Sequence, residues 1–357
     1  MNDYKKTKLY DSHQSLKAKL VPFSGFWMPL QYSSIIKEHH HVRSKSGLFD
    51  VSHMGEFIVS GNNAKTFLQN VTTNDIQNLE AGKVQYSAFC NDSGGVIDDL
   101  LVYHLGDYYM LVVNASNIEK NFEWLSSKLI DDVSLKDKSD TMSLLALQGP
   151  LSRTHLKKLY PKIEDLKYYE TLLPDNNEVI VARTGYSGEL GFEIYAPNSI
   201  ILKLWNEILS LSDDILPVGL GCRDSLRLEM GYCLYGNELN EQTTTIEAGL
   251  SWITKHETSF IGSKSMQDNS PSKKLIALIS EERAIPRSGY KIFSKEKKEV
   301  GVVTSGGMSP CLKKGIALAY VDYEMRLEKE FLIGIRDNFF IFEKTKLPFY
   351  KNGTYLK

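Results

Sequence analysis

Cysteine is scarce in this sequence and shows no regular spacing. The four cysteines of the 357-residue chain lie far apart and form no C-x-x-C pair; they are Cys90, Cys222, Cys233 and Cys311. This spacing argues against a disulfide framework and against a zinc ribbon. We therefore expect free thiols in the core, and we expect no metal.

Long hydrophobic runs are also missing. The longest apolar stretch, 100–115, is interrupted by His104 and Asp107, whereas a membrane-spanning helix needs about 18 uninterrupted apolar residues. No apolar segment follows the N-terminal lysines, so no secretory signal is predicted. The sequence thus predicts a cytoplasmic protein with no membrane span.

The chain has no strong net charge, because 42 basic residues nearly balance 44 acidic ones. Its distribution is uneven: residues 1–270 hold 25 basic and 34 acidic side chains, whereas 271–357 hold 17 and 10. The basic end is either a simple surface asymmetry or a face for an acidic protein partner. Acidic residues interrupt it at Glu296, Glu299 and 324–330, which argues against nucleic acid.

The length suits two or three domains with cores of their own. Residues 55–61 alternate apolar and polar side chains, and three apolar runs with turns between them follow over 83–114. These patterns predict a strand and a β-meander. Ser116 and Glu119 predict a capping box at the start of a helix over 118–129. We therefore expect one α+β unit over residues 50–130.

A second unit with similar patterns follows. It has apolar runs at 142–147 and 179–184, a glycine-rich turn, a strand at 192–195 and a helix around 202–209. A further helix is predicted to end near Gly231. After the polar linker 269–272, the remaining residues contain strand-like runs and no convincing helix. They predict a small all-β domain.

Two adjacent carboxylates, Asp98 and Asp99, lie within an apolar strand pattern. Successive strand residues point to opposite faces, so at least one carboxylate must lie among apolar side chains. Such a group is costly unless it is hydrogen-bonded, paired or functional. The alternative is a strand entrance at which both carboxylates reach water.

The segment 184–193 places Glu193 on a strand after three glycines. Glycine allows either a close approach to a ligand or tight turns. The Glu193 carboxylate could accept two hydrogen bonds from the edge of an amidine-like ring. An ordinary hairpin with Glu193 in solvent is the alternative.

Other features have simpler interpretations. The glycines around Gly221 lack the third glycine of a dinucleotide-binding loop, because Asp224 stands there. Arg223 and Arg227 lie one helical turn apart and could form a solvated face paired with Asp224 or Glu229. Three consecutive histidines, 39–41, cannot share one ion on a helix, so they predict a surface helix.

Taken together, the motifs resemble those of the glycine cleavage T proteins, the folate-binding aminomethyltransferase family. The segments that carry the resemblance run in family order along nearly the whole chain: 23–32, 47–55, 72–75, 94–100, 184–193, 221–228, 234–236 and 303–306. Two positions depart from the family pattern: Ser187 replaces a threonine and Cys222 an alanine.

This resemblance implies an α+β fold of two interleaved antiparallel folate-binding subdomains and a C-terminal all-β, barrel-like domain. The three lobes would surround a central ligand site. The domains would be 1–270 and 271–357, and residues 50–135 would form a subdomain inserted between 1–49 and 136–270.

It also implies transfer of an aminomethyl group from the lipoyl arm of H protein to tetrahydrofolate, with no metal, flavin or nicotinamide. Asp98 matches the family's catalytic aspartate, and Glu193 matches the position that binds the pterin amino edge. Arg223 matches another position that contacts folate. Four further residues match pocket-lining positions: Tyr86, Asn114, Tyr186 and Met54.

Two further hypotheses depend on the resemblance. The lysines 291, 295, 297 and 298 would attract an acidic docking face of H protein. The main alternative function is a non-catalytic or differently specific folate-binding protein of the same fold. Intact Asp98 argues against a non-catalytic module.

Overall fold

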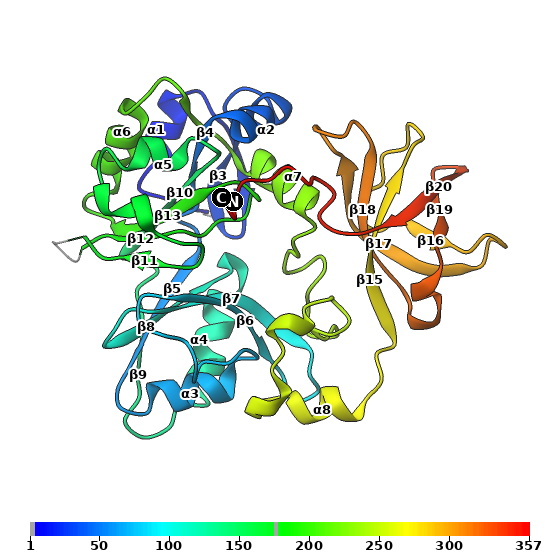
Figure 1. Cartoon of the computed structure of the whole chain (residues 1–357), viewed down its shortest axis with the longest axis horizontal. Coiled ribbons are helices and arrows are strands. Elements are labelled where there is room, and N and C mark those ends of the chain that lie inside the picture. The colour runs from blue at the N-terminus through cyan, green and yellow to red at the C-terminus, as the bar shows by residue number, and fades with distance from the viewer. Residues whose placement is uncertain (1–3, 175–177) are drawn as a thin grey trace.

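The computed structural model describes residues 4–174 and 178–357, which form three lobes (Figure 1). The first lobe contains a mixed six-stranded sheet in the order β11-β12-β13-β10-β4-β14. Its strands are Thr171–Leu172, Ile180–Ala182, Gly191–Pro197, Met142–Gln148, Ser46–Asp50 and Ile215–Pro217. Its helices are α1 (Tyr10–Ser15), α2 (Ile35–Ser44), α5 (Ser152–Leu156), α6 (Ile201–Ser210) and α7 (Leu220–Met230).

A smaller sheet belongs to the same lobe and consists of β1 (Lys5–Lys6), β3 (Phe26–Gln31) and β2 (Lys19–Phe23). The core of the lobe lies between the large sheet and α6, where Leu145, Phe192 and Trp205 are fully buried. Apolar residues at helical spacing give α6 one continuous buried face. The predicted second unit is therefore confirmed as strands with a covering helix.

The second lobe is an antiparallel five-stranded sheet in the order β6-β7-β8-β5-β9. Its elements are β5 (Gly55–Ser60), α3 (Ala64–Val71), β6 (Val84–Cys90), β7 (Val96–His104), β8 (Tyr108–Val113), α4 (Ile118–Ser126) and β9 (Ser134–Asp137). The meander over β6, β7 and β8 confirms the pattern read at 83–114. The lobe connects β4 to β10, which pair with each other in the first lobe, and this connectivity supports the proposed insertion.

The third lobe is a closed antiparallel barrel of six strands, which confirms the expected all-β region. They are β15 (Lys273–Ser280), β16 (Lys291–Phe293), β17 (Glu299–Met308), β18 (Gly315–Asp322), β19 (Glu330–Ile335) and β20 (Asn338–Thr345). Sequence patterns missed β16, because three residues show no periodicity. They also missed β19, which Gly334 interrupts.

Two segments join the barrel to the other lobes. The chain from α7 to α8 (Ser263–Asp268) packs on the second lobe, where Leu239 and Phe260 belong to the same apolar cluster as Val96. The tail after β20 returns to the first lobe (Figure 1), and the Tyr350 N–H donates to the Glu229 carbonyl at 2.9 Å. The barrel is therefore held against the other lobes from both of its ends.

The predicted capping box at Ser116 and Glu119 is wrong. A 3₁₀ turn, Ala115–Asn117, precedes α4, and Asn117 is the N-cap residue without a capping side-chain bond. The Asn117 amide instead donates to Asp98 at 2.7 Å. The side chain of the N-cap residue therefore hydrogen-bonds to the Asp98 carboxylate and does not cap the helix.

The three histidines do lie on a helix, α2, but the expected surface position is wrong for His39. His39 is fully buried, whereas His40 is exposed. All four cysteines are free thiols as expected, and Cys311 alone among them is only partly buried.

The lysines of the predicted docking surface lie on and beside β16. Lys291 forms an ion pair with Glu299 (2.7 Å), and Lys295 forms one with Glu330 (2.5 Å). Exposed pairs of this kind are worth about 1 kcal/mol or less, but each cancels a positive charge locally. Docking of H protein at these lysines stays a prediction. The surface has less unpaired positive charge than the sequence indicates, because Lys291 and Lys295 form ion pairs.

Glu56 on β5 is a buried carboxyl group without a hydrogen-bond partner among the described residues. Burial raises its pKa well above the usual range, and nearby Asp137 adds to the rise. Because the unfolded chain releases this proton near pH 4.3, stability falls by ~1.4 kcal/mol per pH unit from there up to the folded-state pKa.

We therefore expect Glu56→Met to stabilise the protein, and to do so more at pH 8 than at pH 5. Thermal unfolding of both proteins at the two pH values measures this difference. Glu123→Met, a change at an exposed glutamate of α4, is the control and should leave the pH dependence unchanged. Equal stabilisation at both pH values would show that Glu56 is not buried as a neutral acid.

Candidate active site

A cavity of about 1570 Å³ lies where the three lobes meet. The second lobe contributes Tyr86 and Asn114, the first lobe Glu193 and Arg223, and the barrel Ile316. Met54 and Tyr186 also line the cavity. Six of the seven predicted site residues are thus brought together, which the separate sequence motifs alone could not establish. The seventh, Asp98, does not line the cavity.

Asp98 is fully buried on the face of β7 that α4 covers. Its two oxygens accept four hydrogen bonds, from the Asn114 N–H (3.1 Å) and from the side-chain amides of Asn114 (2.8 Å), Asn117 (2.7 Å) and Asn121 (2.5 Å). All of these partners are donors, so the site solvates the charged form. Asp98 acts as a buried anchor for α4 and Asn114.

Asp99 is the carboxylate that faces the cavity. Its Oδ2 accepts from the Tyr86 hydroxyl at 2.8 Å, and its Oδ1 accepts from the Asn114 amide at 2.9 Å. Burial raises the pKa of Asp99, while these two donors oppose the rise. Burial also raises the pKa of Asp98, and the negative charge of Asp99 adds to this rise. Of the two carboxylates, Asp99 is therefore the one that a ligand in the cavity can reach.

Glu193 lies on β13 and is 6% exposed, so the alternative of an ordinary hairpin with Glu193 in solvent is excluded. Its Oε2 accepts from the hydroxyls of Thr184 (2.6 Å), Tyr103 (3.3 Å) and Tyr195 (3.4 Å). Its Oε1 accepts no hydrogen bond from any described residue. One oxygen is thus fixed by the protein, and the other is left for a ligand.

The glycines before Glu193 serve packing. A Cβ at Gly185 or Gly191 would lie 2.1 or 2.3 Å from the Gln148 side chain. Gln148 in turn donates to the Thr184 carbonyl at 3.1 Å and accepts from the Ser187 hydroxyl at 2.6 Å. Glycine at these positions therefore does allow a close approach to the backbone, but the group that approaches is the Gln148 side chain and not a ligand.

Arg223 and Arg227 on α7 have different surroundings. Arg227 is buried and forms ion pairs with Asp224 (2.8 Å) and Glu238 (3.2 Å). Arg223 lines the cavity with its guanidinium 4.8 Å from the centre of the Tyr186 ring. It forms no ion pair or side-chain hydrogen bond within the described part of the chain. Arg227 therefore has the ion pair with Asp224 that the alternative interpretation includes, but it is buried rather than solvated. Arg223 has no charged partner among the described residues and faces the cavity.

Among the cavity-lining residues that sequence reasoning missed, Trp252 and His53 stand out. Trp252 is 55% exposed and its ring lies 5.8 Å from that of Tyr86. His53 is buried, its Nδ1 has no partner among the described residues, and burial lowers its pKa to about 4. An exposed tryptophan has no pattern of its own, and His53 lies within the segment 47–55, where no local pattern marks it as a cavity residue. Both are available to contact a bound molecule.

Among residues 4–174 and 178–357, no helix combines the length and the apolar composition that a membrane crossing requires.

Comparisons with known proteins agree with this architecture. The family model described as the GCVT N-terminal domain matches residues 9–258, and that of the glycine cleavage T-protein C-terminal barrel domain matches 273–351. A curated aminomethyltransferase of Halothermothrix orenii is 45% identical and covers 97% of this chain and 99% of its own length. One of Flavobacterium psychrophilum is 44% identical with the same coverage.

A solved structure gives the same result for the fold. The glycine cleavage system aminomethyltransferase T of Bartonella henselae superposes with a TM-score of 0.94 at 33% identity, over 99% of this chain and 100% of that one. Identity at this level over both family domains, together with a shared three-lobed structure, leaves one assignment. The chain belongs to the glycine cleavage T-protein family of aminomethyltransferases.

Proposed function

We propose that this chain transfers the aminomethyl carbon from the lipoyl arm of H protein to tetrahydrofolate. The products are 5,10-methylenetetrahydrofolate, ammonia and the dihydrolipoyl arm. The observation that carries the proposal is the Asp99 carboxylate, held by Tyr86 and Asn114 at the wall of a cavity shared by all three lobes. Family membership supplies the reaction class, and this geometry supplies a group able to serve it.

The polar groups of the cavity suit a folate. The free Oε1 of Glu193 can accept from the amino edge of a pterin, and the unpaired Arg223 can bind a carbonyl or carboxylate oxygen. Tyr186 supplies an aromatic face. Ligand pockets usually measure about 300–1,000 Å³. The larger volume found here leaves room for a folate together with a lipoyl arm.

The reaction needs an anion beside the carbon that moves. As the carbon–sulfur bond breaks, the carbon gains iminium character and positive charge, and a carbon–nitrogen bond to the folate forms. Ammonia then leaves as the second folate nitrogen closes the ring. The two protons lost from the folate nitrogens finish on sulfur and on ammonia. A carboxylate at this place stabilises the positive charge and carries a proton between these atoms.

We assign this role to Asp99 and withdraw it from Asp98. Asp98 has four donors on its oxygens and no access to the cavity. A proton placed on Asp98 would have to displace one of the N–H groups that now donate to its oxygens. Asp98 then becomes a positioning residue, because it holds the same Asn114 amide that donates to Asp99.

Several finer statements stay predictions with this proposal. They are H protein as the partner, tetrahydrofolate as the only co-substrate that the reaction needs, the cytoplasm as location, and the division of the chain near residue 270. The absence of flavin and nicotinamide is expected from the same resemblance.

A turnover assay with aminomethyl-loaded H protein and tetrahydrofolate tests the function. We expect methylenetetrahydrofolate and ammonia to form in equal amounts, and only when both substrates are present. Folate binding measured by calorimetry in parallel separates the alternative. A protein that binds folate but forms neither product would be the non-catalytic folate-binding member of the same fold.

A further inference from the structure

Trp252 is an exposed aromatic side chain on the wall of the cavity. It is 55% exposed, although tryptophan side chains are highly buried on average. Its ring lies 5.8 Å from that of Tyr86, at an angle of 34°. The Tyr86 hydroxyl donates to Asp99 Oδ2 at 2.8 Å. One side chain thus separates the indole from the carboxylate to which we assign the chemistry.

The backbone around Trp252 is anchored, so the exposed indole belongs to an ordered turn. Residues Ser251–Ile253 form a 3₁₀ turn, and Ile253 is fully buried. The Lys255 N–H donates to the Thr73 carbonyl of the second lobe at 2.8 Å. A side chain held in this way is in place before a ligand arrives, which lowers the entropic cost of binding.

Apolar side chains continue the cavity surface beyond the indole. Leu250 and Leu275 pack in one apolar cluster with Ala248, and all three line the cavity. Ile276 lines it from the next position of β15. Together with Trp252, these residues form what we call the apolar wall. The wall is shared by the barrel and the chain between α7 and α8.

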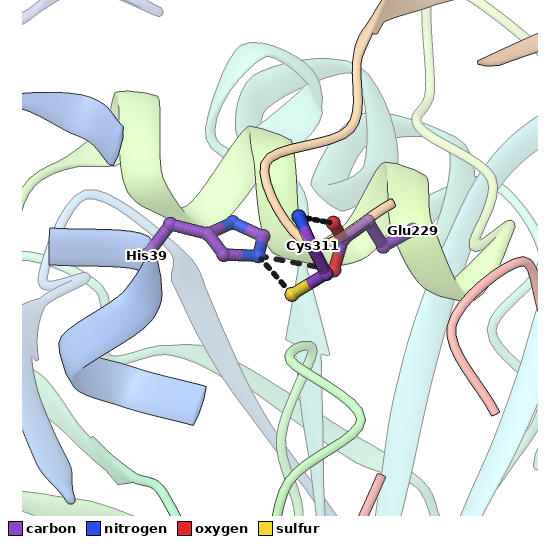
Figure 2. Close-up of side chains that lie close together, drawn as sticks. All are labelled: His39, Glu229 and Cys311. Atoms are coloured by element: carbon purple, nitrogen blue, oxygen red, sulfur yellow. Dashed lines mark hydrogen bonds and ion pairs between the residues drawn. The ribbon is translucent and has the colours of Figure 1, made fainter. Parts of the chain in front are cut away.

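The barrel part of the apolar wall is held in place by a buried polar contact with the first lobe, which Figure 2 shows. His39 Nε2 lies 3.0 Å from Glu229 Oε2, and the Cys311 N–H donates to Glu229 Oε1 at 2.9 Å. The Ser309 hydroxyl donates to the same oxygen at 2.5 Å. The barrel cannot shift against α7 without breaking these buried hydrogen bonds, so the wall is preformed.

The apolar wall suits the chemistry of a lipoyl arm. The arm is an aliphatic chain that ends in two sulfur atoms, and an amide joins it to its carrier protein. An apolar surface binds the chain through the hydrophobic effect, and sulfur makes favourable contacts with aromatic rings. The charged groups of Glu193 and Arg223, which suit a folate, have nothing to pair with on such a chain.

We propose that Trp252 and the apolar wall bind the lipoyl arm of H protein beside Asp99. This inference rests on the proposed transfer reaction, which supplies the arm, and it names the residues that receive it. Folate and the arm would then bind at different surfaces of one cavity, and the carbon would pass between them near Asp99. Two such ligands also account for a cavity larger than an ordinary single-ligand pocket.

Steady-state kinetics test the proposed contact. Trp252→Ala should raise the KM for aminomethyl-loaded H protein about tenfold or more, because the arm loses the apolar area of the indole. Turnover at saturating H protein should change much less, and folate affinity by calorimetry should stay within about twofold of the wild type. Trp252→Phe keeps an aromatic face and should give an intermediate KM. Leu327→Ala, at an exposed leucine that does not line the cavity, is the control.

Fluorescence quenching tests the same contact without turnover. The disulfide of an oxidised lipoyl group quenches indole emission at contact, and Trp252 lines the cavity, whereas Trp27, Trp124 and Trp205 do not. Lipoylated H protein should therefore quench the wild type more than H protein without the lipoyl group does. Trp252→Phe should lose this difference, and Trp27→Phe should keep it. Circular dichroism checks that each variant folds.

The outcomes separate this inference from the proposed function. Wild-type KM for H protein in folded Trp252→Ala, or a quenching difference that Trp252→Phe retains, would show that the arm does not contact the indole. A loss of folate affinity in place of H-protein affinity would overturn the inference too, because it would assign the indole to folate. A wild type that shows the quenching difference but forms no product would refute the transfer reaction and leave the arm contact established.

Discussion

Asp99→Asn is expected to lower turnover about 100-fold or more while folate affinity changes little. The amide keeps the shape of the side chain and can still accept from Tyr86 through its oxygen. It has no charge to stabilise an iminium-like carbon, and it cannot carry the proton. Single-turnover kinetics with loaded H protein measure the chemical step, and calorimetry measures folate binding separately.

Asp98→Asn is the matched comparison, because the two carboxylates are neighbours on one strand. Its amide would place an NH₂ group against the donors of Asn114, Asn117 and Asn121, which now surround a carboxylate. We expect a lower thermal unfolding temperature and an indirect loss of activity through displaced Asn114. Near-normal turnover in Asp99→Asn, together with a large loss in a fully stable Asp98→Asn, would return the catalytic role to Asp98.

The choice between these two carboxylates shows where sequence reasoning ends. Strand alternation correctly predicts that Asp98 and Asp99 face opposite sides of β7. Which side carries α4 and which side meets the cavity depends on packing between lobes. Asn117 and Asn121 lie about 20 residues further along the chain, where they read as ordinary helix-start residues. Their attachment to Asp98 is visible only in three dimensions.

Local patterns succeeded where an element is long and repeats regularly. The meander over β6, β7 and β8 and the helix α6 have a clear period, so their positions could be predicted. The three-residue strand β16 has no period to detect. His39 looked like a surface residue because its partners, Glu229 and Cys311, are 190 and 272 residues away. Burial of a polar side chain by distant partners leaves no local signal.

Glu193→Ala is expected to weaken folate binding by roughly 2–4 kcal/mol, the cost of losing charge-assisted hydrogen bonds at a buried site. The carboxylate is already in place before a ligand arrives, because the hydroxyls of Thr184, Tyr103 and Tyr195 hydrogen-bond to Oε2 and fix the side chain. A contact made equally before and during the reaction affects binding more than the chemical step. At saturating folate, turnover should therefore stay close to that of the wild type.

Tyr103→Phe is the control that distinguishes loss of the Glu193 carboxylate from a nonspecific disturbance of the side chains packed around it. Tyr103 donates to Oε2 only at 3.3 Å and shares a shorter contact of 2.7 Å with the Tyr195 hydroxyl. Its loss leaves the Thr184 bond to Glu193 in place, so folate binding should weaken much less than in Glu193→Ala. Calorimetry on the three proteins measures the order of affinities. Wild-type affinity in folded Glu193→Ala would mean that the free Oε1 meets water rather than the pterin, and that Arg223 and the aromatic side chains carry the folate alone.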